Sequence, residues 1–157
     1  MSLPPIKTLA AILSIATLSQ LGASPVQAQP AAPLAATSAG SLTVTFSGLK
    51  SPGGALMVAL FDSEAAYSGG QPAQAVRIAA DGVAPQAVFG GLKPGRYAIK
   101  AFHDVNGDGK LDTNPFGAPT EPYAFSNNAH ANMAPASWAD AAFTVTAGAN
   151  AQAIVIE

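Results

Sequence analysis

The residues whose types and spacing are best suited to chemistry lie between Asp104 and Asp112. Their pattern, D-x-N-x-D-G-x-L-D, matches the first nine positions of an EF-hand-type calcium loop. Ca²⁺ binds six to eight oxygen atoms at about 2.3–2.6 Å, and a tightly coiled loop can direct alternate side chains at one centre. The spacing therefore predicts a metal site with these ligands: Asp104, Asn106, Asp108, Asp112 and the backbone carbonyl of Lys110.

This loop departs from the calcium pattern at its twelfth position, where Pro115 replaces the bidentate acid. The remaining oxygens would come from water, from a backbone carbonyl, or from another acid such as Asp62, Glu64, Glu121 or Asp140. An incomplete set of ligands is typical of weak extracellular sites, with Kd on the order of 10⁻⁴–10⁻³ M. Gly109 would allow the sharp bend of the loop, and Leu111 is expected to hold the loop against the core.

The alternative for this segment is a metal-free turn, because Asp, Asn and Gly favour turns through side-chain-to-backbone hydrogen bonds. The two histidines add no metal signature. His103 shares the parity of Tyr97, Ile99 and Ala101, so we expect it to point inward and to be hydrogen-bonded near the loop. His130 is expected to be a solvated loop residue.

No familiar catalytic motif accompanies the loop. The sequence has no G-x-S-x-G, no H-E-x-x-H and no phosphate-binding glycine loop. Three carboxylates in one short loop are better explained as oxygen ligands than as a separated acid and base. The sequence gives no cofactor besides Ca²⁺ and no catalytic residue.

The elements that must position this loop are short segments with a period of two, separated by Gly and Pro. They predict an all-β domain, a single antiparallel β-sandwich of about seven strands that is immunoglobulin-like or transthyretin-like, with a small barrel as the alternative. We expect the first two strands to form a hairpin and the last two to pair. The predicted strands are Ser41–Leu49, Ala55–Phe61, Ala75–Ala79, Gln86–Phe89, Arg96–Asp104, Ala141–Thr146 and Ala151–Ile156.

The nearly continuous apolar run Ala55–Phe61 predicts a central strand that is covered on both faces. The segment Thr113–Asp140 has no convincing strand pattern and predicts one long packed loop. Its aromatic side chains are expected to form a satellite core: Phe116, Tyr123, Phe125 and Trp138. Asn127 and Asn128 are expected to tie the loop down, and Arg77, Arg96 and Lys100 to lie on solvated faces.

The start of the chain has the pattern of an exported protein. Residues 1–28 predict a signal peptide, because Lys7 precedes the apolar run Leu9–Leu21 and Val26–Ala28 resembles a cleavage site. That run is shorter than the roughly 20 residues that span a membrane. We expect residues 29–40 to be a flexible Ala/Pro-rich leader and residues 41–157 to form the sandwich. The expected location is periplasmic or secreted.

Composition excludes several classes. The 157 residues contain no cysteine and carry a net charge of −2, so disulfides, thiolate metal sites and electrostatic attraction to nucleic acid are not expected. At 49% hydrophobic residues, the chain is too apolar to be disordered throughout. We expect a monomer with no membrane span in the mature chain.

From Ser41 onward, the chain resembles the uncharacterised bacterial domain-of-unknown-function family 2141. The resemblance rests on LTVTFSGLKSPGGALMVALFDSEAAY at Leu42–Tyr67, GLKPGRYAIKAFHDVNGDGKLDTNPFGAPTEPYAFSNNA at Gly91–Ala129, and FTV at Phe143–Val145. It implies a small exported β-sandwich and no known activity. The similarity of GLKPGRYAI to transthyretin-like modules supports the fold alone.

These observations predict a non-enzymatic binding or structural module of the cell envelope, with a calcium-compatible loop. Its partner would be a small ligand or an envelope protein. Two alternatives remain open: a hydrolase-type enzyme with its site at Asp104–Asp112, and an envelope adaptor that binds a protein through an edge strand. A cleft lined by His103, Asp104 and Tyr123 would favour the enzyme.

Overall fold

The computed structural model describes residues 39–82 and 84–157. The predicted signal peptide and nearly all of the predicted leader lie outside these residues. Eight strands are present in the described part: β1 (Gly40–Ser47), β2 (Ala55–Phe61), β3 (Gln74–Ala79), β4 (Gln86–Leu92), β5 (Gly95–Asp104), β6 (Tyr123–Phe125), β7 (Phe143–Val145) and β8 (Gly148–Val155). The short helices are α1 (Glu64–Gly69), the 3-10 turn η1 (Ser126–Asn128) and α2 (Trp138–Ala141).

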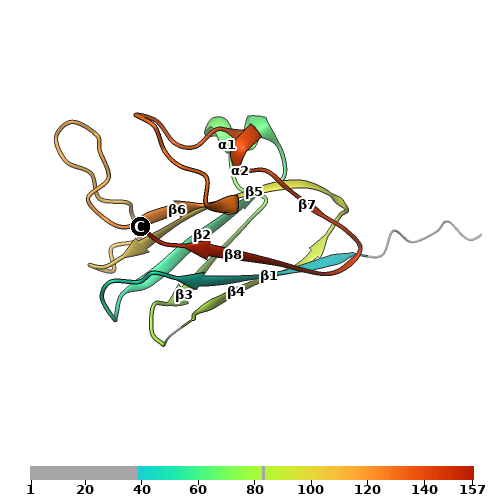
Figure 1. Ribbon diagram of the computed structural model, residues 1–157, viewed down its shortest axis with the longest axis horizontal. Helices are drawn as coiled ribbons and strands as arrows, with labels where there is room; N and C mark the ends of the chain where they lie inside the picture. Colours follow the sequence, from blue (N-terminus) through green and yellow to red (C-terminus); the bar gives the residue numbers. More distant parts are fainter. Residues whose placement is uncertain (1–38, 83) are drawn as a thin grey trace, which may run out of the picture. The chain divides into compact units, whose positions relative to one another are not determined.

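The strands form two sheets that pack face to face, so the predicted β-sandwich is confirmed (Figure 1). One sheet has three strands in the order β4-β1-β8. The other has five strands, in the order β3-β2-β5-β6 with β7 also paired to β5. All strand pairs are antiparallel except β1–β8, which is parallel.

The core follows from the alternation of side chains along these strands. Leu42, Val44 and Phe46 of β1 are fully buried and face the inner side of the other sheet, where Leu56 and Leu60 of β2 are also fully buried. Burying a side chain of this size stabilises the fold by about 1.5–3 kcal/mol. Truncating Phe46 to Ala would cost about 3–5 kcal/mol, because a cavity would remain.

Two of the predicted pairings are wrong. β1 and β2 do not form a hairpin, because β1 lies between β4 and β8 whereas β2 lies between β3 and β5. The last two strands do not pair either, since β7 pairs with β5 and β8 with β1. The alternating pattern specifies which face of a strand is buried, but it carries no information on the neighbouring strand.

The segment Thr113–Asp140 is not a single loop. It contains a bridge between Thr113 and Pro119, followed by β6 and η1. A period-two signal three residues long is too short to recognise in the sequence, which explains why β6 was missed. The part after η1 packs back on the sheet, so the prediction of a packed segment is confirmed there.

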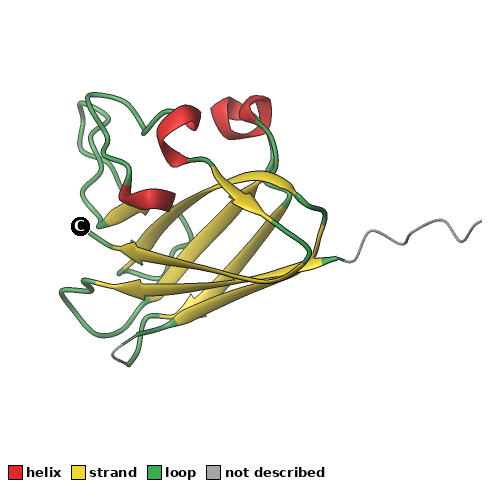
Figure 2. Ribbon diagram, turned by 45° about the vertical axis from the view of Figure 1, so that its right-hand side comes forward, coloured by secondary structure: helices red, strands yellow, loops and turns green. Residues whose placement is uncertain are grey.

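A second apolar cluster covers one end of the outer face of the five-stranded sheet. Figure 2 shows α1 and α2 side by side above this end of the sheet, and the rings of Tyr67 and Trp138 lie 5.8 Å apart. Buried members of the cluster are Phe61, Tyr67, Ala98, Phe125, Ala136 and Ala141. Ser63 caps α1 by accepting a hydrogen bond from the amide of Ala66.

Candidate functional site

The acidic loop begins at the buried end of β5. Asp104 is fully buried, and its two carboxylate oxygens accept hydrogen bonds from the amides of Gly107 at 2.7 Å and Gly109 at 3.0 Å. Gly109 has a φ of 80°, which confirms the sharp bend expected there. In this structure, Asp104 therefore fixes the shape of the loop.

The other predicted ligands also bond within the loop. Asn106 accepts a hydrogen bond from the amide of Asp108, and Asp108 accepts one from the amide of Lys110. The Asn106 amide group donates to the carboxylate of Asp112 at 2.9 Å. These are the local bonds of Asx turns. In residues 39–82 and 84–157, no group of three or more His, Asp or Glu side chains is arranged to hold a metal ion.

Glu121 lies against the same loop. Its side chain is buried, and its two oxygens accept hydrogen bonds from the amides of Val105 at 2.8 Å and Asp112 at 3.1 Å. Among the acids considered as replacements for the twelfth position, Glu121 is the one that bonds to the loop. Asp140, in contrast, bonds to Ser137 at the start of α2.

The loop concentrates negative charge. The pKa of Asp112 is raised above its ordinary value by partial desolvation and by the charges of Asp108, Glu121 and Asp104. Such repulsion is what a cation would relieve. Ca²⁺ binding to this loop stays a prediction.

His103 lies in the core behind the loop, as predicted. It is fully buried, and its Nε2 is 2.7 Å from the carbonyl oxygen of Gly53. Its Nδ1 is buried and has no hydrogen-bond partner among the described residues. The exposed position of His130 also agrees with the sequence.

An apolar groove of about 940 Å³ lies on the outer face of the five-stranded sheet. Its floor follows the cross-strand register. One row contains Phe102, Met57 and Arg77, and the next contains Lys100, Ala59 and Ala75. Because Ala59 and Ala75 have small side chains beside these larger neighbours, the middle of the face is hollow. We call this feature the sheet groove.

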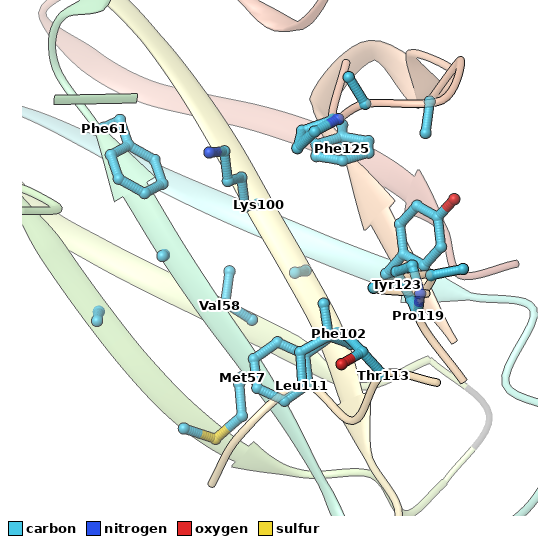
Figure 3. A pocket seen from close by; sticks show the side chains of 18 of the residues that line it. Met57, Val58, Phe61, Lys100, Phe102, Leu111, Thr113, Pro119, Tyr123 and Phe125 are labelled. Carbon is cyan, nitrogen blue, oxygen red and sulfur yellow. The ribbon is translucent and has the colours of Figure 1, made fainter. Parts of the chain in front are cut away.

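Two segments border the sheet groove (Figure 3). One is the end of the acidic loop with the hairpin that follows it, which contribute Leu111, Phe116 and Pro119. The other is the stretch 131–135 with Met133. The side chains of Phe116 and Met133 are almost completely exposed. Leu111 does not hold the loop against the core as expected, and Phe116 is not part of a satellite core. Both contribute to the border of the groove instead.

Lys100 is the charged group most deeply placed in the sheet groove. Its amine donates a hydrogen bond to the carbonyl of Tyr67 at 2.6 Å and lies 4.2 Å from the Tyr67 ring centroid and 5.3 Å from that of Phe61. Burial lowers its pKa. The prediction of a solvated face is therefore wrong for Lys100, whereas Arg77 is exposed.

Sequence reasoning missed the sheet groove, although one signal pointed to it. β2 is apolar on both faces, which indicated that its second face would be covered. Phe61 is covered by the second cluster, but Met57 and Ala59 face the open groove. Of the three residues named for a candidate cleft, Tyr123 lines the sheet groove, whereas His103 and Asp104 are fully buried and do not line it.

Fold and site together define a small β-sandwich with an open apolar groove on one outer face. The model of the family described as uncharacterized protein conserved in bacteria, domain-of-unknown-function family 2141, matches residues 44–153. The chain therefore belongs to this family, as its resemblance implied. No curated protein and no solved structure matches the chain. Within the described residues, no helix is both long and apolar enough to cross a membrane.

Proposed function

We propose that the chain is an exported binding protein, located in the periplasm or secreted, that holds an apolar small molecule in the sheet groove. The observation that carries this proposal is the groove itself. Its volume of about 940 Å³ is within the range of about 300–1,000 Å³ that is typical of small-molecule sites. The groove combines a mostly apolar lining with few polar groups, as such sites do.

The contrast between the two outer faces supports the same function. The outer face of the three-stranded sheet presents mostly small or polar residues, such as Thr43, Thr45 and Ala151, with Val88 and Val155 as its exposed larger apolar side chains. The outer face of the five-stranded sheet presents Met57, Phe102 and further apolar side chains. Apolar surface gains about 25 cal/mol per Å² when it leaves water, so a ligand would gain most of its binding energy on the second face.

A fluorescent apolar probe, N-phenyl-1-naphthylamine, tests this function with the protein comprising residues 29–157. We expect its emission to rise on binding to the wild type. Ala59→Trp fills the floor of the groove and should abolish the rise. Ala151→Trp places the same ring on the other outer face and should leave the rise unchanged.

Equal binding by both variants would contradict the proposal, as would no binding by the wild type. Sedimentation velocity over a range of concentrations tests a different occupant, a second copy of the chain. The monomer that we propose should keep one sedimentation coefficient. A dimer that Ala59→Trp dissociates would assign the groove to self-association instead.

The export component of the proposal rests on the residues at the start of the chain, from Lys7 through Ala28. Intact-mass measurement of protein from an exporting host should give a chain that begins near Gln29. A mass that retains residues 1–28 would contradict export by cleavage.

We also propose that the acidic loop binds Ca²⁺ weakly, with Glu121 supplying the acid that Pro115 does not. Two facts favour it: the hydrogen bonds that hold Glu121 against the loop, and the charges of neighbouring acids, which together with desolvation raise the pKa of Asp112. The loop continues directly into the hairpin that borders the sheet groove. An ion there would therefore also steady one wall of the groove.

Thermal melting tests the ion. At a hundredfold excess over Kd, Ca²⁺ would stabilise the native state by about 2.7 kcal/mol, which raises the Tm of a domain this size by several degrees. Mg²⁺ should do less, because it requires a tighter octahedron. Asp108→Ala should remove the Ca²⁺ response, and Asp81→Ala, in an exposed turn, should retain it. If the Tm of the wild type changes neither with Ca²⁺ nor with a chelator, the loop is a metal-free turn and the proposal of Ca²⁺ binding is contradicted.

A further inference from the structure

We propose that the occupant of the sheet groove is an amphipathic molecule, whose anionic head group binds the amine of Lys100 and whose apolar body lies along β2 and β5. This inference rests on the proposed binding function and specifies the chemical class of the ligand.

The charges of the groove are the first argument. The chain as a whole has nine acidic and seven basic residues. Among the described residues that line the groove, however, the charged ones are Arg77 and Lys100, and both are cationic. A groove whose charged residues are all cationic attracts anionic ligands. A neutral apolar ligand would leave both cations without a partner from the ligand.

The position of Lys100 is the second argument. Its amine is held between the backbone and two aromatic rings, with one hydrogen bond to the Tyr67 carbonyl. An ammonium group has three donors, so donors remain for a ligand oxygen. Desolvation is the cause that lowers its pKa, which is the direction expected where no carboxylate offsets the burial. A ligand carboxylate or sulfate would supply that missing charge.

The shape of the groove is the third argument. Figure 3 shows the Lys100 amine directed toward Phe61, whereas Met57, Phe102 and Leu111 gather at the other end. Lys100 and Phe102 are two residues apart on β5, so about 7 Å of strand separates the row of Lys100 from the row of Phe102 and Met57, which ends at the exposed Arg77. A ligand with one charged end and an apolar body matches this polarity of the groove.

The experiment compares three probes that share one apolar chain: dodecanoate, dodecanol and the dodecyltrimethylammonium cation. Each displaces N-phenyl-1-naphthylamine from residues 29–157 at neutral pH and below its micelle concentration. We expect dodecanoate to bind about tenfold or more tightly than dodecanol, because a hydrogen bond to a charged group contributes that much. The cation should bind most weakly.

Substitutions of Lys100 test whether this residue causes the preference for dodecanoate over dodecanol. Lys100→Met should remove the preference for dodecanoate and leave dodecanol affinity nearly unchanged. Lys100→Arg should restore the preference, because it keeps the charge. Lys50→Met, in the exposed turn after β1, is the matched control and should bind as the wild type does. Urea denaturation of each variant shows that it is folded.

The outcomes separate the two proposals. Equal affinity of the wild type for dodecanoate and dodecanol, both abolished by Ala59→Trp, would overturn the anionic head group and keep the apolar groove. Displacement by neither molecule would overturn the binding function as well. A preference for dodecanoate that persists in Lys100→Met would assign it to another cation, for which Arg77→Gln is the test.

Discussion

The carboxylate of Glu121 accepts a hydrogen bond from the amide of Val105 at 2.8 Å, across the neck of the acidic loop. Its second oxygen accepts from the amide of Asp112. The Glu121 side chain thus joins the two ends of the acidic loop, whereas Asp104 and Asp108 accept hydrogen bonds from amides within the loop.

Replacing Glu121 should therefore destabilise the fold. Glu121→Ala leaves two partly buried amides without acceptors, and hydrogen bonds to charged groups contribute about 1.5–3 kcal/mol each. We expect a loss of about 2–4 kcal/mol in the free energy of unfolding, measured with urea. Glu121→Gln keeps one acceptor oxygen and should lose less. Asp81→Ala is the control, and an equal loss there would show that the loop contacts are unimportant.

Replacing Asp112 should instead stabilise the fold when Ca²⁺ is absent. Its pKa is raised in the folded state, so the folded chain binds this proton more tightly than the unfolded chain does. This group favours folding below its ordinary pKa of 3.8 and opposes it as the pH rises through the folded value. Asp112→Asn should raise the Tm at neutral pH in a chelator, and the difference should vanish in acid. A lower Tm at neutral pH would contradict this.

Ionisation of Tyr67 should lower the free energy of unfolding at alkaline pH. Its hydroxyl donates to the carbonyl of Ala136 at 2.9 Å, and burial, with the charge of Asp140, raises its pKa to about 12. The unfolded chain would ionise this group near its ordinary pKa of 10.0, so its contribution is complete below that pH and is lost as the pH rises towards 12. Tyr67→Phe should lose about 1 kcal/mol at neutral pH and flatten the decline between pH 10 and 12. If the loss of stability between pH 10 and 12 is the same in Tyr67→Phe as in the wild type, other groups cause it.

Ser126 should be sensitive to small changes. It is fully buried, and its hydroxyl joins the amide of Ile99 at 2.8 Å to the carbonyl of Ala141 at 2.6 Å. Ser126→Ala leaves both groups buried and unpaired, so we expect a loss of about 2–3 kcal/mol in urea. Ser137→Ala removes an exposed hydroxyl at the start of α2 and should lose about 1 kcal/mol. Equal losses would mean that Ser126 acts only as a local cap.

Several features could be predicted from the sequence because they depend on local chemistry. The alternation of Leu42, Val44 and Phe46 places β1 in a half-buried sheet, and the burial of His103 follows from its parity in β5. The tie that Asn127 makes to α2, through the carbonyls of Asp140 and Ala142, is also as expected.

The sheet groove could not be predicted, because it depends on which strands are neighbours. Ala59 and Ala75 create a hollow only when β2 and β3 place them side by side. Likewise, Lys100 has the pattern of a solvated residue until α1 places the Tyr67 ring beside its amine. The exposure of Phe116 results from the hairpin between Thr113 and Pro119, which carries this ring away from the sandwich.

The parallel pairing of β1 with β8 governs the order of folding. Asn150 donates to the carbonyl of Ser41, a contact that spans 109 positions of the chain. β1 is the central strand of its sheet, so this sheet lacks one neighbour until the last strand has been synthesised. Contacts of such long range require costly loop closure before they stabilise anything, and they slow folding. The three-stranded sheet is therefore complete only when β8 pairs with β1, and a chain that stops before Gly148 would leave one edge of β1 open to pairing with other molecules.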